Sequence, residues 1–148
     1  MHARRAIVNA AATALNPLSI TGSRVHPGRT RPIAANGEPY LLVYARQEQA
    51  AGATMKGAGR KLLRRLNLVV EGVDTGATDT DELLDQIAEQ VEAALAADST
   101  LGGTCKDLEL AQTEIVPTTD DAERRIVVIR LTFAVVYMTV DTDPATAV

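Results

Sequence analysis

Residues 124–139, RRIVVIRLTFAVVYMT, are the stretch from which the fold of this chain is most readily predicted. The stretch is rich in β-branched and aromatic residues and contains no Gly, Pro, Asn or Asp. Because successive side chains of a strand point to opposite faces, its odd positions would form one continuous apolar face. These positions are Val127, Ile129, Leu131, Phe133, Val135 and Tyr137. We therefore predict a long, strongly twisted or bent strand, about 50 Å if straight, at the centre of a sheet.

A helix and a second strand are predicted just before this long strand. Helical spacing of apolar residues indicates a helix from about Asp81 to Ala97, and a strand is expected over Asp107–Val116 with a turn at Pro117–Asp121. The apolar stripe of the helix consists of Leu84, Ile87, Ala88, Val91 and Leu95. Its outer face carries the acids Asp81, Asp85, Glu89 and Glu92, and the helix holds no Lys or Arg to pair with them.

The first half of the chain predicts another helix and several strands. Residues 3–15 show helical spacing, and Asn16-Pro17 should end that helix. The remaining expected elements are a short irregular strand at Ile20–Val25, a turn at His26-Pro27-Gly28, an edge strand at Thr30–Ile33, and better strands at Tyr40–Arg46 and Leu62–Asp74. Residues 47–61 are rich in Gly and Ala, so we expect a mobile basic hairpin loop there. The tail, 142–148, is expected to be frayed.

This element order predicts a single α+β domain over residues 1–148. We expect an antiparallel or mixed β-sheet with a long central C-terminal strand, a main helix packed on one face, and an N-terminal helix. The N-terminal segment, which has no acid before Glu38, also resembles a transit peptide, an alternative that the sequence leaves open. No apolar run is long enough to cross a bilayer, so no membrane partner is expected.

Charge is unevenly distributed along the chain, although the formal total is only −4. Residues 1–65 carry eleven Arg or Lys and two acids, a balance of +9, whereas residues 66–148 carry four Arg or Lys and seventeen acids, a balance of −13. Such polarity bears on partners rather than on fold. It suits nucleic-acid binding by the basic half, or self-association of basic and acidic halves. Alternatively, the two halves interleave in the folded monomer and the polarity disappears.

The residues that usually carry catalysis are sparse and badly placed. His2 and His26 have no acidic or Cys neighbour, and Cys105 has no sequence context that would activate it. The Gly-rich stretch 52–59 has Ala58 where a phosphate-binding loop requires Lys. We therefore predict neither an enzyme nor a cofactor or metal site.

Two stretches together resemble a known family. They are residues 84–115, LDQIAEQVEAALAADSTLGGTCKDLELAQTEI, and the long strand that follows a charged turn. In this order they are similar to the C-terminal half of small siphophage tail-terminator and tail-completion proteins, the group of minor tail protein U. The matching elements are Leu84–Leu95, Leu101-Gly102-Gly103, Leu108–Val116 and Ile126–Tyr137, and the opening helix and the strand at Tyr40–Arg46 also fit the pattern.

The resemblance implies a structural virion protein. It would form a ring, expected to be a hexamer, at the head-proximal end of the tail, where it stops tube polymerisation. Its partners would be further copies of itself, the tail tube protein and the head-tail connector or stopper protein, and DNA would pass through the lumen without specific binding.

The charged residues can be given hypothetical roles in such a ring. We place Arg46, Lys56, Arg60, Lys61 and Arg64 at a subunit or ring interface. The acids Asp81, Asp85, Glu89 and Glu92 would line the lumen. The alternatives are another head-tail joining or neck protein, or a basic-armed nucleic-acid-binding domain that uses loop 47–61 and Arg24–Arg31.

Overall fold

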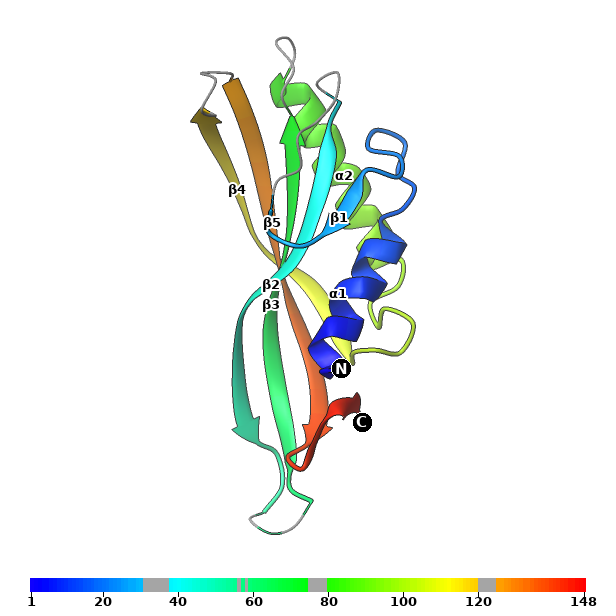
Figure 1. The fold of residues 1–148 in the computed structure, drawn as a ribbon, viewed down its shortest axis with the longest axis vertical. Helices are drawn as coiled ribbons and strands as arrows, with labels where there is room; N and C mark the ends of the chain where they lie inside the picture. The colour runs from blue at the N-terminus through cyan, green and yellow to red at the C-terminus, as the bar shows by residue number, and fades with distance from the viewer. Residues whose placement is uncertain (31–37, 56, 58, 75–79, 120–124) are drawn as a thin grey trace.

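Two helices cover one face of a six-stranded mixed sheet in the computed structural model, which describes residues 1–30, 38–55, 57, 59–74, 80–119 and 125–148 (Figure 1). The helices are α1 (Ala3–Ala14) and α2 (Thr80–Ala96). The strands are β1 (Val25–Pro27), β2 (Tyr40–Gly52), β3 (Lys61–Asp74), β4 (Asp107–Thr119), β5 (Arg125–Val140) and β6 (Asp143–Ala147). The predicted α+β class is confirmed.

The strand order is β1-β2-β3-β5-β4, and β6 pairs with the far end of β5. Only β1 and β2 run parallel; the other pairs are antiparallel. β5 is the 16-residue strand expected from the sequence, but β3 rather than β5 occupies the middle of the order. Both strands are internal, which leaves β4 along one edge of the sheet.

The main core lies between the helices and the sheet. The odd positions of β5 from Val127 to Tyr137 are all buried, as the alternation of that strand predicts. They pack with the apolar stripe of α2 and with Ile7, Val8 and Ala11 of α1. Gly72 on β3 permits this approach, because a Cβ there would lie 2.8 Å from Cγ2 of Ile87. A smaller cluster on the opposite face contains Tyr40, Leu42, Val73 and Val128.

Strands β2 and β3 extend together into a hairpin arm, which we define as residues 46–52 and 61–67 (Figure 1). The prediction of a loop over 47–61 was wrong for residues 47–52, which continue β2 and pair with β3. Ala and Gln are compatible with a strand when the neighbouring strand provides a full ladder of backbone hydrogen bonds. Lys56 and Ala58 lie outside the described residues.

Other local predictions were also corrected by the fold. The tail is not frayed, since residues 143–147 form β6 against β5. Residues 20–24 are turns and an isolated bridge rather than a strand, while His26 and Pro27 belong to β1. β4 continues through Pro117 to Thr119, where a turn was expected. Residues 31–33 of the predicted edge strand and residues 120–121 of that turn lie outside the described residues.

Candidate interaction surfaces

A buried carboxylate, Glu48, organises the helix-facing side of the hairpin arm. Its side chain is 9% exposed and forms ion pairs with Arg64 at 2.9 Å and with Arg4 of α1 at 3.2 Å. The hydroxyl of Tyr137 donates to its other oxygen, Oε1. Arg64 in turn donates from Nε to Thr139 Oγ1 at 2.9 Å. This network joins α1 to β2, β3 and β5 through charged groups.

A β-bulge puts Glu48 in this position. The register of β2 against β3 shifts between Ala45 and Gln47, so Arg46 is the extra residue. Residues 41, 43 and 45 face the helices before the bulge, whereas Glu48, opposite Leu66, faces them after it. Sequence reasoning did not identify Glu48, because the composition of residues 47–61 predicts a loop, and unbroken alternation of β2 would also have turned Glu48 to the other face. One signal was present, since Glu48 is one of two acids in the first 65 residues.

A second buried carboxylate, Glu71, lies on the opposite face of the sheet. Tyr44 donates its hydroxyl hydrogen to Glu71 at 2.6 Å, and Arg130 Nε lies 3.0 Å from the same oxygen. Arg130 also approaches Glu114 of β4 at 3.7 Å. Glu71, Arg130 and Glu114 are direct cross-strand partners, so this network runs across β3, β5 and β4.

The arginines and lysines predicted for an interface have different environments. Arg46 and Lys61 are exposed on the hairpin arm. Arg60 is partly buried, and its Nε has no hydrogen-bond partner among the described residues. Arg64 is only 12% exposed and is held by Glu48 and Thr139, so it belongs to the interior of the arm. Lys56 lies outside the described residues.

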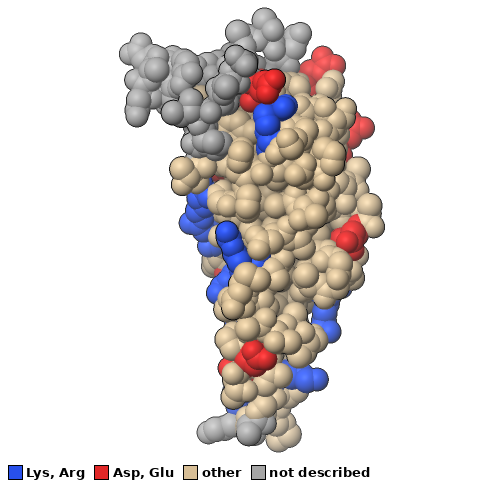
Figure 2. Space-filling model, turned by 45° about the vertical axis from the view of Figure 1, so that its right-hand side comes forward, with Lys and Arg blue, Asp and Glu red and all other residues tan. Residues whose placement is uncertain are grey.

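The acids predicted for a lumen follow one side of α2. Asp81, Asp85 and Glu89 are exposed, and Glu92 is partly buried. In Figure 2, acidic side chains follow the upper right flank of the molecule and basic side chains gather at mid-height on the left, but further basic side chains lie near the top and on the lower right. The two signs of charge are therefore only partly separated on the visible surface.

The edge strand β4 exposes apolar and acidic side chains together. Ile115 is 52% exposed and Leu110 is 39% exposed, and both lie on the helix-facing side of the sheet beyond the cover of α2. The acids Asp107, Glu109 and Glu114 are exposed along the same strand. An uncovered edge of this kind can pair with another chain.

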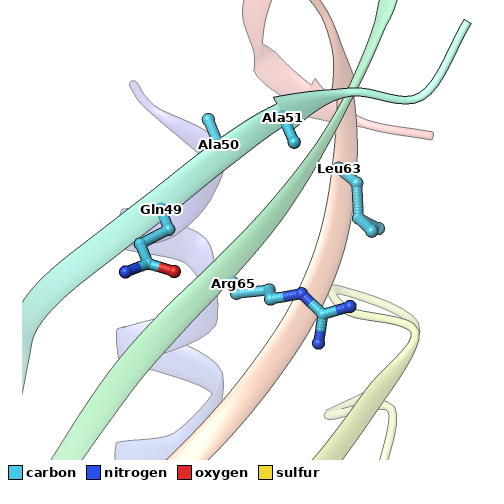
Figure 3. Close-up of a pocket in the computed structure, with 5 residues that line it drawn as sticks. All are labelled: Gln49, Ala50, Ala51, Leu63 and Arg65. Atoms are coloured by element: carbon cyan, nitrogen blue, oxygen red, sulfur yellow. The ribbon is translucent and has the colours of Figure 1, made fainter.

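A shallow depression lies on the hairpin arm, with a volume of about 440 Å³. Figure 3 shows its lining residues, Gln49, Ala50 and Ala51 from β2 and Leu63 and Arg65 from β3. Gln49 faces Arg65 and Ala51 faces Leu63 as cross-strand partners. Among the described residues, this lining offers no carboxylate, thiol or imidazole.

The groups that could carry metal or thiol chemistry are dispersed. Within the part of the chain that the structure describes, no three His, Cys, Asp or Glu side chains come close enough to share a metal ion. Cys105 is buried, and burial raises the pKa of its thiol to about 11. At neutral pH this thiol is protonated and a weak nucleophile. None of the described helices is long and apolar enough to cross a membrane.

Comparison with known proteins adds no assignment. No family model matches this chain, and no curated protein sequence matches it either.

Proposed function

We propose that this chain is a structural virion protein, the terminator that caps the head-proximal end of a siphophage tail tube as a ring. In this role it stops tube polymerisation and provides the docking surface for the head connector. The proposal joins the resemblance of residues 84–137 to tail-terminator proteins with one structural observation, the partial separation of charge on the surface.

The ion pairs between described residues do not join the basic half to the acidic half. Arg4 and Arg64 pair with Glu48, and Arg24 pairs with Glu38, all within residues 1–65. Arg130 pairs with Glu71 and Glu114, all within residues 66–148. In the sheet, β1 and β2 of the first half lie on one side of β3, and β5 and β4 of the second half lie on the other. These pairs leave an excess of positive charge in one half and of negative charge in the other.

A head-to-tail ring requires two different patches that complement each other on each copy. The acidic patch would be the edge of β4 with Glu109, Glu114 and the exposed Ile115. The basic patch would be the hairpin arm with Arg46 and Lys61. Apolar contact at Ile115 would provide stability, while the charges would select the orientation of the neighbouring copy.

The acidic side of α2 suits the lumen of such a ring. Asp81, Asp85 and Glu89 would present negative charge to DNA, and like charges would keep the phosphate backbone from adhering. The tail tube protein and the head-tail connector or stopper protein would contact the two ends of the ring.

The oligomeric state of the purified full-length chain tests this proposal. We expect sixfold rings in electron micrographs and a hexamer mass by light scattering, with dissociation as salt is raised. The double reversal Arg46→Glu with Lys61→Glu should abolish the rings. Arg65→Glu, which reverses an exposed arginine elsewhere on the same arm, is the matched control and should leave them intact. A monomer at every concentration and salt would refute the proposal.

The same variants can be tested in an assembling tail. Reversal of Arg46 and Lys61 should give tails of irregular length that fail to join heads. Tails of normal length and normal head joining would contradict the assigned interface. A ring found only at another neck position would support the alternative of a different head-tail joining protein.

A further inference from the structure

An arginine-lined pocket of about 280 Å³ lies where the start of α1 meets the segment after β1 and the middle of β2. Its polar lining comprises His2, Arg4, Arg5, Arg29 and Tyr44, and none of the described lining residues carries a carboxylate. The sequence places Arg29 in the basic stretch Arg24–Arg31, an alternative nucleic-acid contact, but does not join it to Arg4 and Arg5, which lie more than twenty residues earlier. The fold brings the three arginines to the lining of one cavity.

Most of the N–H donors of these guanidinium groups remain available. Each group carries five N–H donors. Arg4 uses Nη1 for Glu48, and Arg29 uses Nη2 for the carbonyl oxygens of Ala45 and Arg46. The side chain of Arg5 is exposed and makes no hydrogen bond or ion pair with any described residue. The pocket therefore offers several charged donors to an incoming acceptor.

Two of the arginines are already held in place. The guanidinium carbon of Arg29 lies 5.0 Å from the ring centroid of Tyr44, and its Nη2 is 2.6 Å from the Ala45 oxygen. Arg4 is held by its ion pair with Glu48 at 3.2 Å. A binding group that is ordered before the ligand arrives loses less entropy when it binds.

The local charge around the pocket is positive. The pKa of His2 is lowered, first by burial and then by the charges of Arg4 and Arg64, although Glu48 acts in the opposite direction. The positive end of the α1 dipole lies at the same place. Guanidinium groups bind oxyanions through paired, charge-assisted hydrogen bonds.

We propose that this pocket binds a phosphate group, either of free inorganic phosphate or of a nucleic-acid backbone. Arg5 and Arg29 donate to the phosphate oxygens, and Arg4, fixed by Glu48, adds charge at the base of the pocket. This inference does not rest on the ring proposal, since the site lies within one copy of the chain.

The test is a titration of the full-length protein with inorganic phosphate at constant pH, with sodium chloride used to hold ionic strength constant. The ring signals of His2, followed by NMR, should shift and reach saturation. Arg5→Ala and Arg29→Ala should each weaken binding about tenfold, the effect of losing one charge-assisted hydrogen bond. Arg65→Ala, which removes an exposed arginine of the hairpin arm that does not line the pocket, should leave the affinity unchanged. Circular dichroism checks that each variant is folded.

A second titration with a short DNA duplex distinguishes the two sources of phosphate. Displacement of inorganic phosphate by the duplex, with the same dependence on Arg5 and Arg29, assigns the site to a nucleic-acid backbone. Saturable phosphate binding without displacement assigns it to free phosphate. The proposal would be overturned if the His2 signals responded to both phosphate and duplex without ever reaching saturation. It would also be overturned if Arg65→Ala weakened phosphate binding as much as Arg5→Ala or Arg29→Ala.

Discussion

Glu48 and Glu71 make similar contacts on opposite faces of the sheet, but the groups around them carry opposite net charge. Each carboxylate binds one arginine and one tyrosine, Arg64 and Tyr137 in the first case and Arg130 and Tyr44 in the second. The additional group differs: Arg4 joins the Glu48 site, whereas Glu114 joins the Glu71 site. Among the described residues, the first site thus has two positive charges for one negative, and the second has two negative charges for one positive.

This difference shows how one sheet can carry a basic and an acidic side. The residues that form each Glu–Arg–Tyr set are largely buried, so they contribute little to the surface by themselves. The additional charged group, Arg4 in the first site and Glu114 in the second, decides the sign of the net charge of each site. Arg4 comes from α1 and adjoins the arginine-lined pocket, whereas Glu114 comes from the exposed edge strand β4.

Removal of each carboxylate charge should give the largest effects. Glu48→Gln leaves Arg64, 12% exposed, without its ion pair, and we expect a loss of about 3 kcal/mol in the free energy of unfolding. Glu71→Gln should cost less, about 2 kcal/mol, because Arg130 is 24% exposed and keeps Glu114. Urea unfolding measures both.

Glu109→Gln is the matched control, since Glu109 is an exposed acid on β4. It should change the free energy of unfolding by less than about 0.5 kcal/mol. Equal losses in the free energy of unfolding for Glu48→Gln and Glu71→Gln would contradict this reasoning. They would show that neither the exposure of the arginine nor the additional charged group makes the two sites differ in stability.

Removal of each tyrosine hydroxyl should give a smaller effect. Tyr137→Phe deletes a donor to Glu48 in a fully buried environment, and we expect a loss of about 1.5 kcal/mol in the free energy of unfolding. Tyr44→Phe should cost about 0.5 kcal/mol, because Tyr44 is partly exposed and water can replace its hydrogen bond to Glu71. This substitution keeps the aromatic ring, which would still support Arg29.

A double-mutant cycle checks whether each hydroxyl acts through its carboxylate. The effects of Tyr137→Phe and Glu48→Gln should be non-additive. Those of Tyr137→Phe and Glu71→Gln should add, since these two residues lie on opposite faces of the sheet and far apart along β3 and β5. Additivity within the Glu48 site would mean that the hydrogen bond between Tyr137 and Glu48 contributes no coupling energy.

Much of the fold could be predicted from residue patterns. The alternation in β5 identified its buried face, and the apolar spacing of α1 and α2 identified both helices within a few residues. These signals are local, because one strand or helix carries all the residues that define them. The extension of β2 through residues 47–52 was missed, since its stability comes from pairing with β3 and not from its own composition.

The two carboxylate sites could not be predicted, because both depend on register. The Arg130 partners Glu71 and Glu114 are aligned only when β3, β5 and β4 pair as they do. The burial of Glu48 further requires the bulge at Arg46, which reverses the faces of the residues that follow. The arginine-lined pocket has the same origin, since it combines α1, the segment after β1 and β2.

Alkaline pH should reveal the smallest and most gradual difference between the two sites. Burial and the neighbouring carboxylate raise the pKa of both Tyr44 and Tyr137 above the usual value of 10. The folded protein therefore keeps these protons where the unfolded chain loses them. Their contribution to stability is fully present below pH 10 and is lost as the pH rises through the folded pKa.

Urea unfolding at a series of pH values above 10 measures this loss, with phenolate absorbance as an independent readout. We expect the decline to be less steep in Tyr137→Phe and only slightly altered in Tyr44→Phe, because Tyr137 is the more deeply buried of the two. Cys105 also contributes, since its pKa is raised to about 11, and Cys105→Ala isolates that contribution. Identical pH dependence in the wild-type protein and Tyr137→Phe would show that Tyr137 ionises as readily in the folded protein as in the unfolded chain.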